Sequence, residues 1–327
     1  MKKFISLSLV LLMMFSVLSL AGCGKAEPLK MGIGITAEIS EIKNADGETN
    51  GSADSVATFA AVLLDKDGKI VKCAIDTANN ALAFTSEGKP VAAGELLTKG
   101  EKGDNYGMKK AGAKKEWYEQ KDAFISVVIG KTIDEVKALE KDGKGTDEVV
   151  NAGCTIKVSE FIPALEEAVK NAAESEATAD DTLQVGIVTS QSDKKDATDE
   201  AKGLNEFSLT FVATAIDADK KIVASKTDAL SFAVEFDTKG VSETEFGKDV
   251  ATKRDAGDDY GMKKAGAKKE WYAQADAFDA QIIGKTADGI TTLADNTGKA
   301  GDDLVTAGCT INVADMVKAA VKAATVK

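Results

Sequence analysis

The chain has 327 residues and a formal net charge of −12, with 53 aspartates and glutamates against 41 lysines and arginines. Phosphate backbones repel so acidic a protein, which argues against nucleic-acid binding. The sequence has no histidine, which excludes the Ser-His-Asp and Cys-His nucleophile systems, His-ligated zinc and c-type haem attachment.

The N-terminus has the pattern of a lipoprotein signal peptide. Lys2 and Lys3 precede an apolar run, and residues 1–22 are predicted to be a cleaved signal. The run ends in Leu20-Ala21-Gly22-Cys23, which resembles a bacterial lipobox. This resemblance implies cleavage before Cys23 and a diacylglycerol thioether on its sulfur. The alternative is an ordinary signal peptide that happens to contain a cysteine.

A lipid on Cys23 predicts a location at the extracytoplasmic face of the cell membrane. Two or three acyl chains anchor a protein firmly, because each buried methylene contributes about 0.8 kcal/mol. No second stretch of the sequence is long and apolar enough to span a bilayer. Residues 23–30 are expected to link the anchor to the folded part.

The rest of the chain is a tandem repeat. The segment YGMKKAGAKKEWY occurs unchanged at Tyr106–Tyr118 and at Tyr260–Tyr272, whereas its flanks differ. The repeat has a period of about 154 residues, since Tyr260 follows Tyr106 by that number. So long a period predicts two whole domains, residues 31–171 and 183–327. The polar segment 172–182 between them is interpreted as a linker or a frayed helix end. We expect each module to fold independently and the linker to be cut first by proteases.

Each module begins with a predicted β-hairpin. Apolar and polar residues alternate on both sides of Asp67-Gly68, which is a strong hairpin signal. The corresponding stretch from Phe207 to Asp228 has the same alternation but lacks the glycine at the turn.

Helices follow the hairpin in each module. In the stretch from Lys114 to Ile129, Trp117, Phe124 and Val128 fall on one helical face. Thr132 and Glu135 have the spacing of a capping box, and an amphipathic helix is expected from Ser159 to Ala173. The fold class predicted is α+β, with a mostly antiparallel sheet and packed helices in each module.

The end of each module resembles the bacterial FMN-binding domain. The segments AGCTIKVSEFIPALEEAV and AGCTINVADMVKAAV match that family's Ser-Gly-Ala-Thr element and the alanine-rich helix after it. Gly153 and Thr155, like Gly308 and Thr310, fall on the family's glycine and flavin-carrying threonine. Alanines replace the family's serine and cysteines its alanine. The resemblance implies FMN, a flavin transferase and a membrane redox partner, with electron transfer at the cell surface.

The duplicated loop suits such a ligand. Four lysines form a basic cluster in each copy, and an indole can stack on a flat ring. Gly107 and Gly112 permit a tight loop, and backbone amides at a helix start beside Thr155 or Thr310 are expected to hold a phosphate. The candidate side chains are Lys109, Lys110, Lys114, Lys115 and Trp117, and in the second copy Lys263, Lys264, Lys268, Lys269 and Trp271.

Other interpretations of these residues stay open. The two threonines could be strand residues beside buried cysteines, and the loop a packing element with solvated lysines. Cys73, Cys154 and Cys309 are interpreted as small buried residues, with a Cys154–Cys309 disulfide as the alternative. No metal site is expected.

The chain is predicted to be an electron carrier or binding protein rather than an enzyme. The alternatives are a non-catalytic surface lipoprotein that binds another ligand or partner, and a structural spacer.

Overall fold

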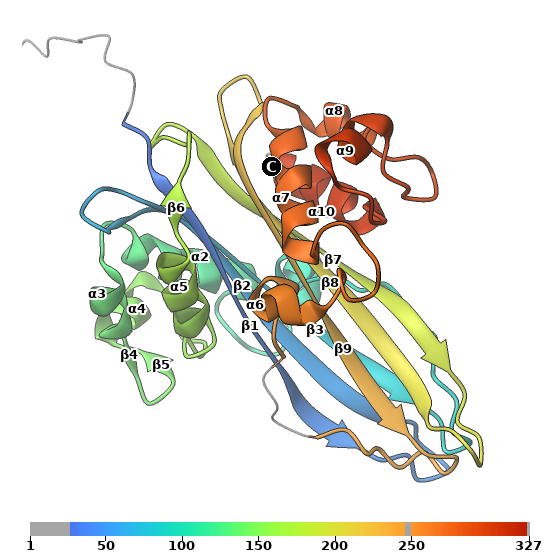
Figure 1. Ribbon diagram of the computed structural model, residues 1–327. Coiled ribbons are helices and arrows are strands. Elements are labelled where there is room, and N and C mark those ends of the chain that lie inside the picture. Colours follow the sequence, from blue (N-terminus) through green and yellow to red (C-terminus); the bar gives the residue numbers. More distant parts are fainter. Residues whose placement is uncertain (1–26, 246–249, 326–327) are drawn as a thin grey trace, which may run out of the picture.

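The computed structural model describes residues 27–245 and 250–325, and it has the predicted α+β class. The signal peptide and Cys23 lie outside the described residues. Each module is built on an antiparallel meander of three long strands (Figure 1). The strands are β1 (Lys30–Lys43), β2 (Gly51–Leu64) and β3 (Ile70–Phe84) in the first module, and β7 (Thr182–Lys195), β8 (Gly203–Ile216) and β9 (Ile222–Phe236) in the second.

Short helices follow the third strand of each meander. They pack at one end of the long strands, and the other end carries only turns and loops (Figure 1). The helices are α1 (Lys99–Lys102), α2 (Trp117–Val128), α3 (Ile133–Lys137), α4 (Asp147–Ala152) and α5 (Phe161–Lys170), then α6 (Lys253–Ala256), α7 (Trp271–Ile282), α8 (Ala287–Thr291), α9 (Asp302–Ala307) and α10 (Ala314–Ala324). Single 3₁₀ turns (Gly103–Tyr106, Gly257–Tyr260) follow α1 and α6, and β4 (Glu140–Lys141) pairs with β5 (Lys144–Gly145). Among the described residues, no helix is long and apolar enough to cross a membrane.

The central strand of each meander is buried on both faces along its second half. In β2, Phe59 and Leu63 point into a core between the two sheets, while Ala60 and Val62 point into a core with the helices of the same module. Such continuous apolar runs, rather than strict alternation, are what a strand covered on both faces requires.

The two sheets pack face to face about a pseudo-twofold axis. Phe59 stacks on Phe211, its equivalent in the repeat, with ring centroids 5.2 Å apart, and Phe84 stacks on its equivalent Phe236 at 4.7 Å. Contact between equivalent residues is the signature of a twofold interface. Residues of both modules therefore form one core, and we no longer expect the modules to fold independently.

The segment 172–182, interpreted as a linker or a frayed helix end, pairs with the first module. Its β6 strand (Ala173–Glu174) extends the first sheet by pairing with β1. The amide of Leu29 donates to the carbonyl of Ala177 at 2.7 Å, and Ala177 is fully buried. Preferred cleavage in this segment is therefore not expected, because its backbone is hydrogen-bonded and partly buried.

The predicted local signals for turns and caps are confirmed. Gly68 has φ +76° in the β2–β3 turn, and Lys220 takes the same left-handed place in the β8–β9 turn with φ +63°. Thr132 and Glu135 form the capping box of α3.

One pair of glycines sets how closely the last helix approaches each sheet. A Cβ at Gly34 would collide with the backbone of α5, and one at Gly186 with the backbone of α10. Both glycines therefore permit direct helix–strand backbone contact. This contact fixes where the side chains of Glu167 and Lys322 emerge at the boundary between the modules.

Candidate functional site

A buried glutamate holds the duplicated loop in shape. The Glu116 carboxylate accepts hydrogen bonds from the amides of Met108 and Lys109 at 2.8 and 3.0 Å. Glu270 does the same for Met262 and Lys263 at 2.8 and 3.1 Å. Both glutamates are 2 % exposed, and a charged acceptor makes such bonds strong. Packing thus accounts for part of the identity between the two copies.

A buried glutamine joins the loop to the predicted flavin-carrying threonine. Oε1 of Gln120 accepts from the amide and hydroxyl of Thr155 at 2.9 and 2.8 Å, and its Nε2 donates to the carbonyl of Lys115 at 3.1 Å. Gln274 binds Thr310 and Lys269 in the same way. Thr155 and Thr310 remain exposed at the surface.

The expected phosphate cradle at a helix start is wrong. Gly153 (φ +106°) is the left-handed residue that ends α4, so Thr155 follows the carbonyl end of a helix and not its amide end. In the second module the Lys269 ammonium donates to the carbonyl of Ala307 at 3.1 Å, next to Gly308. The last lysine of each loop therefore serves the helix end, where positive charge is favourable.

An aromatic cavity lies beside Trp117 in the first module. Its volume is 290 Å³, and its lining is Lys99, Tyr106, Met108, Trp117, Ile156, Lys157 and Glu160. The Lys99 ammonium lies over the Trp117 ring, 5.8 Å from its centroid. Burial lowers the pKa of Lys99, and the nearby Glu160 carboxylate partly offsets this effect. Trp117 is only 4 % exposed, so it offers a ligand little of its ring.

The second module repeats this lysine–aromatic arrangement. Lys253 lies over two rings, 5.3 Å from the centroid of Tyr260 and 5.6 Å from that of Trp271. Lys253 corresponds to Lys99, and both precede the duplicated loop by a few residues. The sequence interpretation missed these two lysines because they lie outside the identical segment.

Packing does not require the first three lysines of each loop copy, here called the outer lysines. They are Lys109, Lys110 and Lys114 in the first copy and Lys263, Lys264 and Lys268 in the second. Lys109 pairs with Glu119 at 2.6 Å, but alanine replaces that glutamate in the second copy, where Lys263 lies 3.9 Å from Asp258. The remaining outer lysines, Lys110, Lys114, Lys264 and Lys268, are exposed. Their identity in the two copies is therefore left unexplained by the fold.

Cys154 and Cys309 are small buried residues, as predicted, whereas Cys73 is half-buried. Cys154 and Cys309 are both free and lie in the separate helical cores of the two modules, so the alternative of a disulfide between them is wrong. Burial raises the pKa of both thiols, that of Cys309 to about 11. No group of three or more acidic or cysteine side chains within 27–245 and 250–325 could hold a metal ion.

Two buried side chains at this site were not predicted. Glu116 is the buried N-cap residue of α2 and Gln120 lies on the buried face of that helix, and their counterparts Glu270 and Gln274 occupy the same places at α7. A polar residue repeated on an apolar helical face was the available signal for a buried hydrogen-bond network. Comparison of the chain with family models, with curated proteins and with solved structures gave no match.

Proposed function

We propose that the protein is a lipid-anchored binding protein of the extracytoplasmic membrane face that holds FMN non-covalently for electron transfer. The observation that carries the proposal is the identity of exposed lysines in both copies of the loop, beside a lysine-capped aromatic cavity. An anionic ligand with a flat ring accounts for both features, because lysines attract its phosphate and the cavity wall contacts its ring.

The residues at the cavity fit the ring and the charge of FMN. Tyr106, Met108, Trp117 and Ile156 supply aromatic and apolar wall, and the volume of 290 Å³ lies near the lower end of ligand pockets, which are about 300–1,000 Å³. Lys99, Lys157 and Glu160 stand at the same cavity, and the Glu160 carboxylate lies 3.8 Å from the Lys99 ammonium. The flavin would supply the redox chemistry, and the protein would bind and orient it.

A covalent link at Thr155 is not part of the proposal. The hydroxyl of Thr155 already donates to the neutral amide of Gln120. No acid or base among the described residues contacts this hydroxyl. The threonine is therefore treated as a packing residue that ties the chain after α4 to helix α2.

Fluorescence titration tests the proposal. The chain has two tryptophans, Trp117 and Trp271, one in each module. Each of the single variants Trp117→Phe and Trp271→Phe therefore keeps one tryptophan, which reports on the other module. FMN is expected to quench tryptophan emission and lose its own fluorescence at micromolar concentration. No quenching at tens of micromolar in wild type overturns the proposal.

Charge variants separate a specific site from general attraction. Lys109, Lys110 and Lys114 changed together to glutamine should weaken binding about tenfold in low salt, and less in high salt, because salt screens surface charges. Lys66, Lys69 and Lys141 are exposed lysines elsewhere in the same module. Their triple glutamine variant removes the same charge and should bind FMN like the wild type.

A second candidate function is non-catalytic binding of another ligand. It is favoured by the way packing already uses Glu116, Trp117 and Gln120. In that case the lysine variants would weaken binding of a polyanion such as heparin, while FMN would bind none of the proteins.

A further inference from the structure

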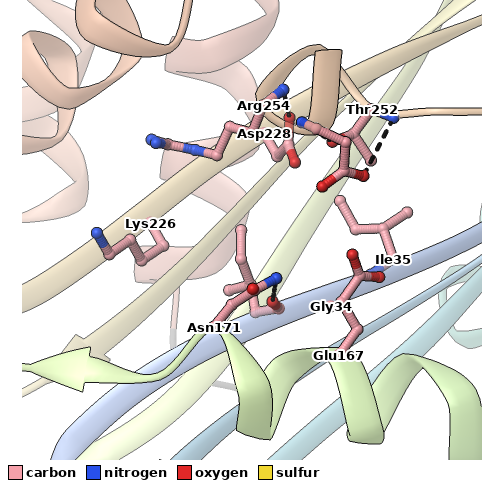
Figure 2. Close-up of a pocket in the computed structure, with 10 residues that line it drawn as sticks. Gly34, Ile35, Glu167, Asn171, Lys226, Asp228, Thr252 and Arg254 are labelled. Atoms are coloured by element: carbon pink, nitrogen blue, oxygen red, sulfur yellow. Dashed lines mark hydrogen bonds between the residues drawn. The ribbon is translucent and has the colours of Figure 1, made fainter. Parts of the chain in front are cut away.

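A second cavity lies between the modules and shares no residue with the aromatic cavity. Its volume is 280 Å³. Residues 33–35 of β1 and the end of α5 form one side, and β9 and α6 of the other module form the opposite side (Figure 2). The wall carries both charges: Glu167, Asp228 and Asp255 are acidic, and Lys226 and Arg254 are basic.

The pseudo-twofold axis provides an internal comparison for this cavity. By alignment of the repeats, Ile35, Glu167 and Asp255 correspond to Ile187, Lys322 and Glu101. The equivalent place on the other side of the axis is here called the twin junction. There the Lys322 ammonium contacts Oε1 of Glu101 at 2.5 Å and donates to the carbonyl of Ile187 at 2.9 Å. There the chain itself places an ammonium group between the modules.

The cavity has a carboxylate where its counterpart has that ammonium. Oε2 of Glu167 accepts from the amide of Ile35 at 2.9 Å, and Asp255 stands in the place of Glu101. Burial raises the pKa of Glu167, and repulsion by Asp255 adds to this effect. Neither carboxylate forms an ion pair with any residue that the structure describes. The cation present at the twin junction is therefore missing here.

Two cationic groups at the cavity also have no counterpart at the twin junction. Lys226 and Arg254 replace Ala74 and Gly100. The side chain of Arg254, the only arginine in the chain, donates to the carbonyl of Thr227 at 2.6 Å and pairs with Asp276 at 2.9 Å and with Asp279 at 3.4 Å. The side-chain ammonium of Lys226 has no hydrogen bond or ion pair within the described part of the chain. Figure 2 shows the ends of Lys226 and Arg254 towards one side of the view and the Glu167 carboxylate towards the other.

We propose that this cavity binds a small zwitterion with a primary ammonium and a carboxylate, in the manner of a free α-amino acid. The ligand ammonium takes the role that Lys322 has at the twin junction, between Glu167 and Asp255. The ligand carboxylate meets Lys226 and Arg254, since a positioned guanidinium is a good carboxylate receptor.

Isothermal titration with the twenty common amino acids, one at a time, tests the proposal. At least one is expected to bind with a Kd below about 1 mM, a modest affinity for a small ligand. Butylamine and butyrate, which each carry one of the two charges, should bind at least about tenfold more weakly, as expected when one charge-assisted contact is lost. Binding by no amino acid, or equal binding of butylamine, overturns the proposal.

Variants copied from the twin junction locate the site. Glu167→Lys introduces the twin's own ammonium and should abolish amino-acid binding by filling the site, while FMN titration stays unchanged. Lys226→Ala copies Ala74 and should weaken binding about tenfold. The reverse change, Lys322→Glu, opens the twin junction without adding cationic groups, so it should create no second site. Wild-type affinity in both Glu167→Lys and Lys226→Ala would contradict the assignment.

Discussion

Phe59 and Phe211 occupy the same position in the two repeats, and their rings stack on each other between the sheets. The same holds for Phe84 and Phe236. Reciprocal backbone bonds surround them: Ala45 donates to the carbonyl of Gly240, and Ala197, the equivalent of Ala45, donates to that of Gly88. The duplicated chain is therefore arranged like a homodimer joined into one polypeptide.

The shared core predicts how isolated halves behave. Residues 27–178 or 179–327 alone would expose the apolar face that Phe59 and Phe211 now cover, so each half should self-associate or lose fixed packing. Light scattering of the purified halves measures this directly. A monomeric half with a cooperative thermal transition would show that the modules are independent after all.

The buried glutamate of the loop is expected to be a strong local stabiliser. Glu116→Gln keeps the size of the side chain but removes its charge, so the two amides of Met108 and Lys109 lose a charge-assisted acceptor. The expected cost is about 1.5–3 kcal/mol in the free energy of unfolding. Denaturant titration gives this value, and Glu270→Gln should cost about as much because its contacts match. Near-zero values for both variants would mean that these carboxylates do not hold the loops.

The β8–β9 turn offers a stabilising change. Lys220 adopts φ +63°, a conformation that costs a residue with a Cβ roughly 1–2 kcal/mol. Lys220→Gly removes this strain but adds freedom to the unfolded chain, so a net gain of up to about 1 kcal/mol is expected. Gly68→Ala, at the equivalent turn, should destabilise the protein. Thermal melts of both variants check the sign, and a less stable Lys220→Gly protein would contradict the turn geometry.

Asp228 predicts part of the pH dependence of stability. Burial raises its pKa from 3.8 to about 6, and hydrogen bonds and Arg254 offset only part of that rise. The folded state therefore binds this proton more tightly than the unfolded state, so the contribution of Asp228 to stability falls as pH rises from about 4 to about 6. Asp228→Asn should flatten that fall.

Thermal melts between about pH 2 and pH 7 measure this effect. Asp237 gives a contrast, because hydrogen bonds from the amides of Val241 and Lys239 lower its pKa. Its contribution is present at neutral pH and is lost as pH falls through its folded pKa, so Asp237→Asn should change the profile with the opposite sign. Identical profiles for wild type and Asp228→Asn would show that Asp228 does not titrate in this range.

Local patterns in the sequence predicted local structure well. The alternation around Asp67-Gly68 and the spacing of Thr132 and Glu135 specify a turn and a cap through nearby residues alone. Residues 30–43 also alternate, but the glycines at Gly32 and Gly34 weaken the pattern, and this strand was not predicted. Contacts between distant parts of the chain were harder to predict from the sequence. That both faces of β2 are covered shows only when the second sheet is in place.

For the candidate site, too, local patterns in the sequence did not reveal contacts between distant residues. The spacing of Gly153 and Thr155 could not reveal that α4 ends at Gly153, so the predicted helix start was wrong. Polar residues that hold a site from within, such as Gln120, look like surface residues until burial is known. The asymmetry between Glu167 and Lys322 is visible in the aligned repeats. Its meaning depends on Asp255 and Glu101, which only the fold brings to the junctions.

Native mass spectrometry of the protein from its own host tests the central claim most directly. We expect a chain that begins at a lipid-modified Cys23 and carries the mass of FMN, which is lost when the protein is denatured. Thr155→Ala should retain the bound flavin, because the proposed binding is non-covalent. A native spectrum with lipid as the only addition would contradict flavin binding, and flavin that survives denaturation in wild type but not in Thr155→Ala would contradict the non-covalent mode.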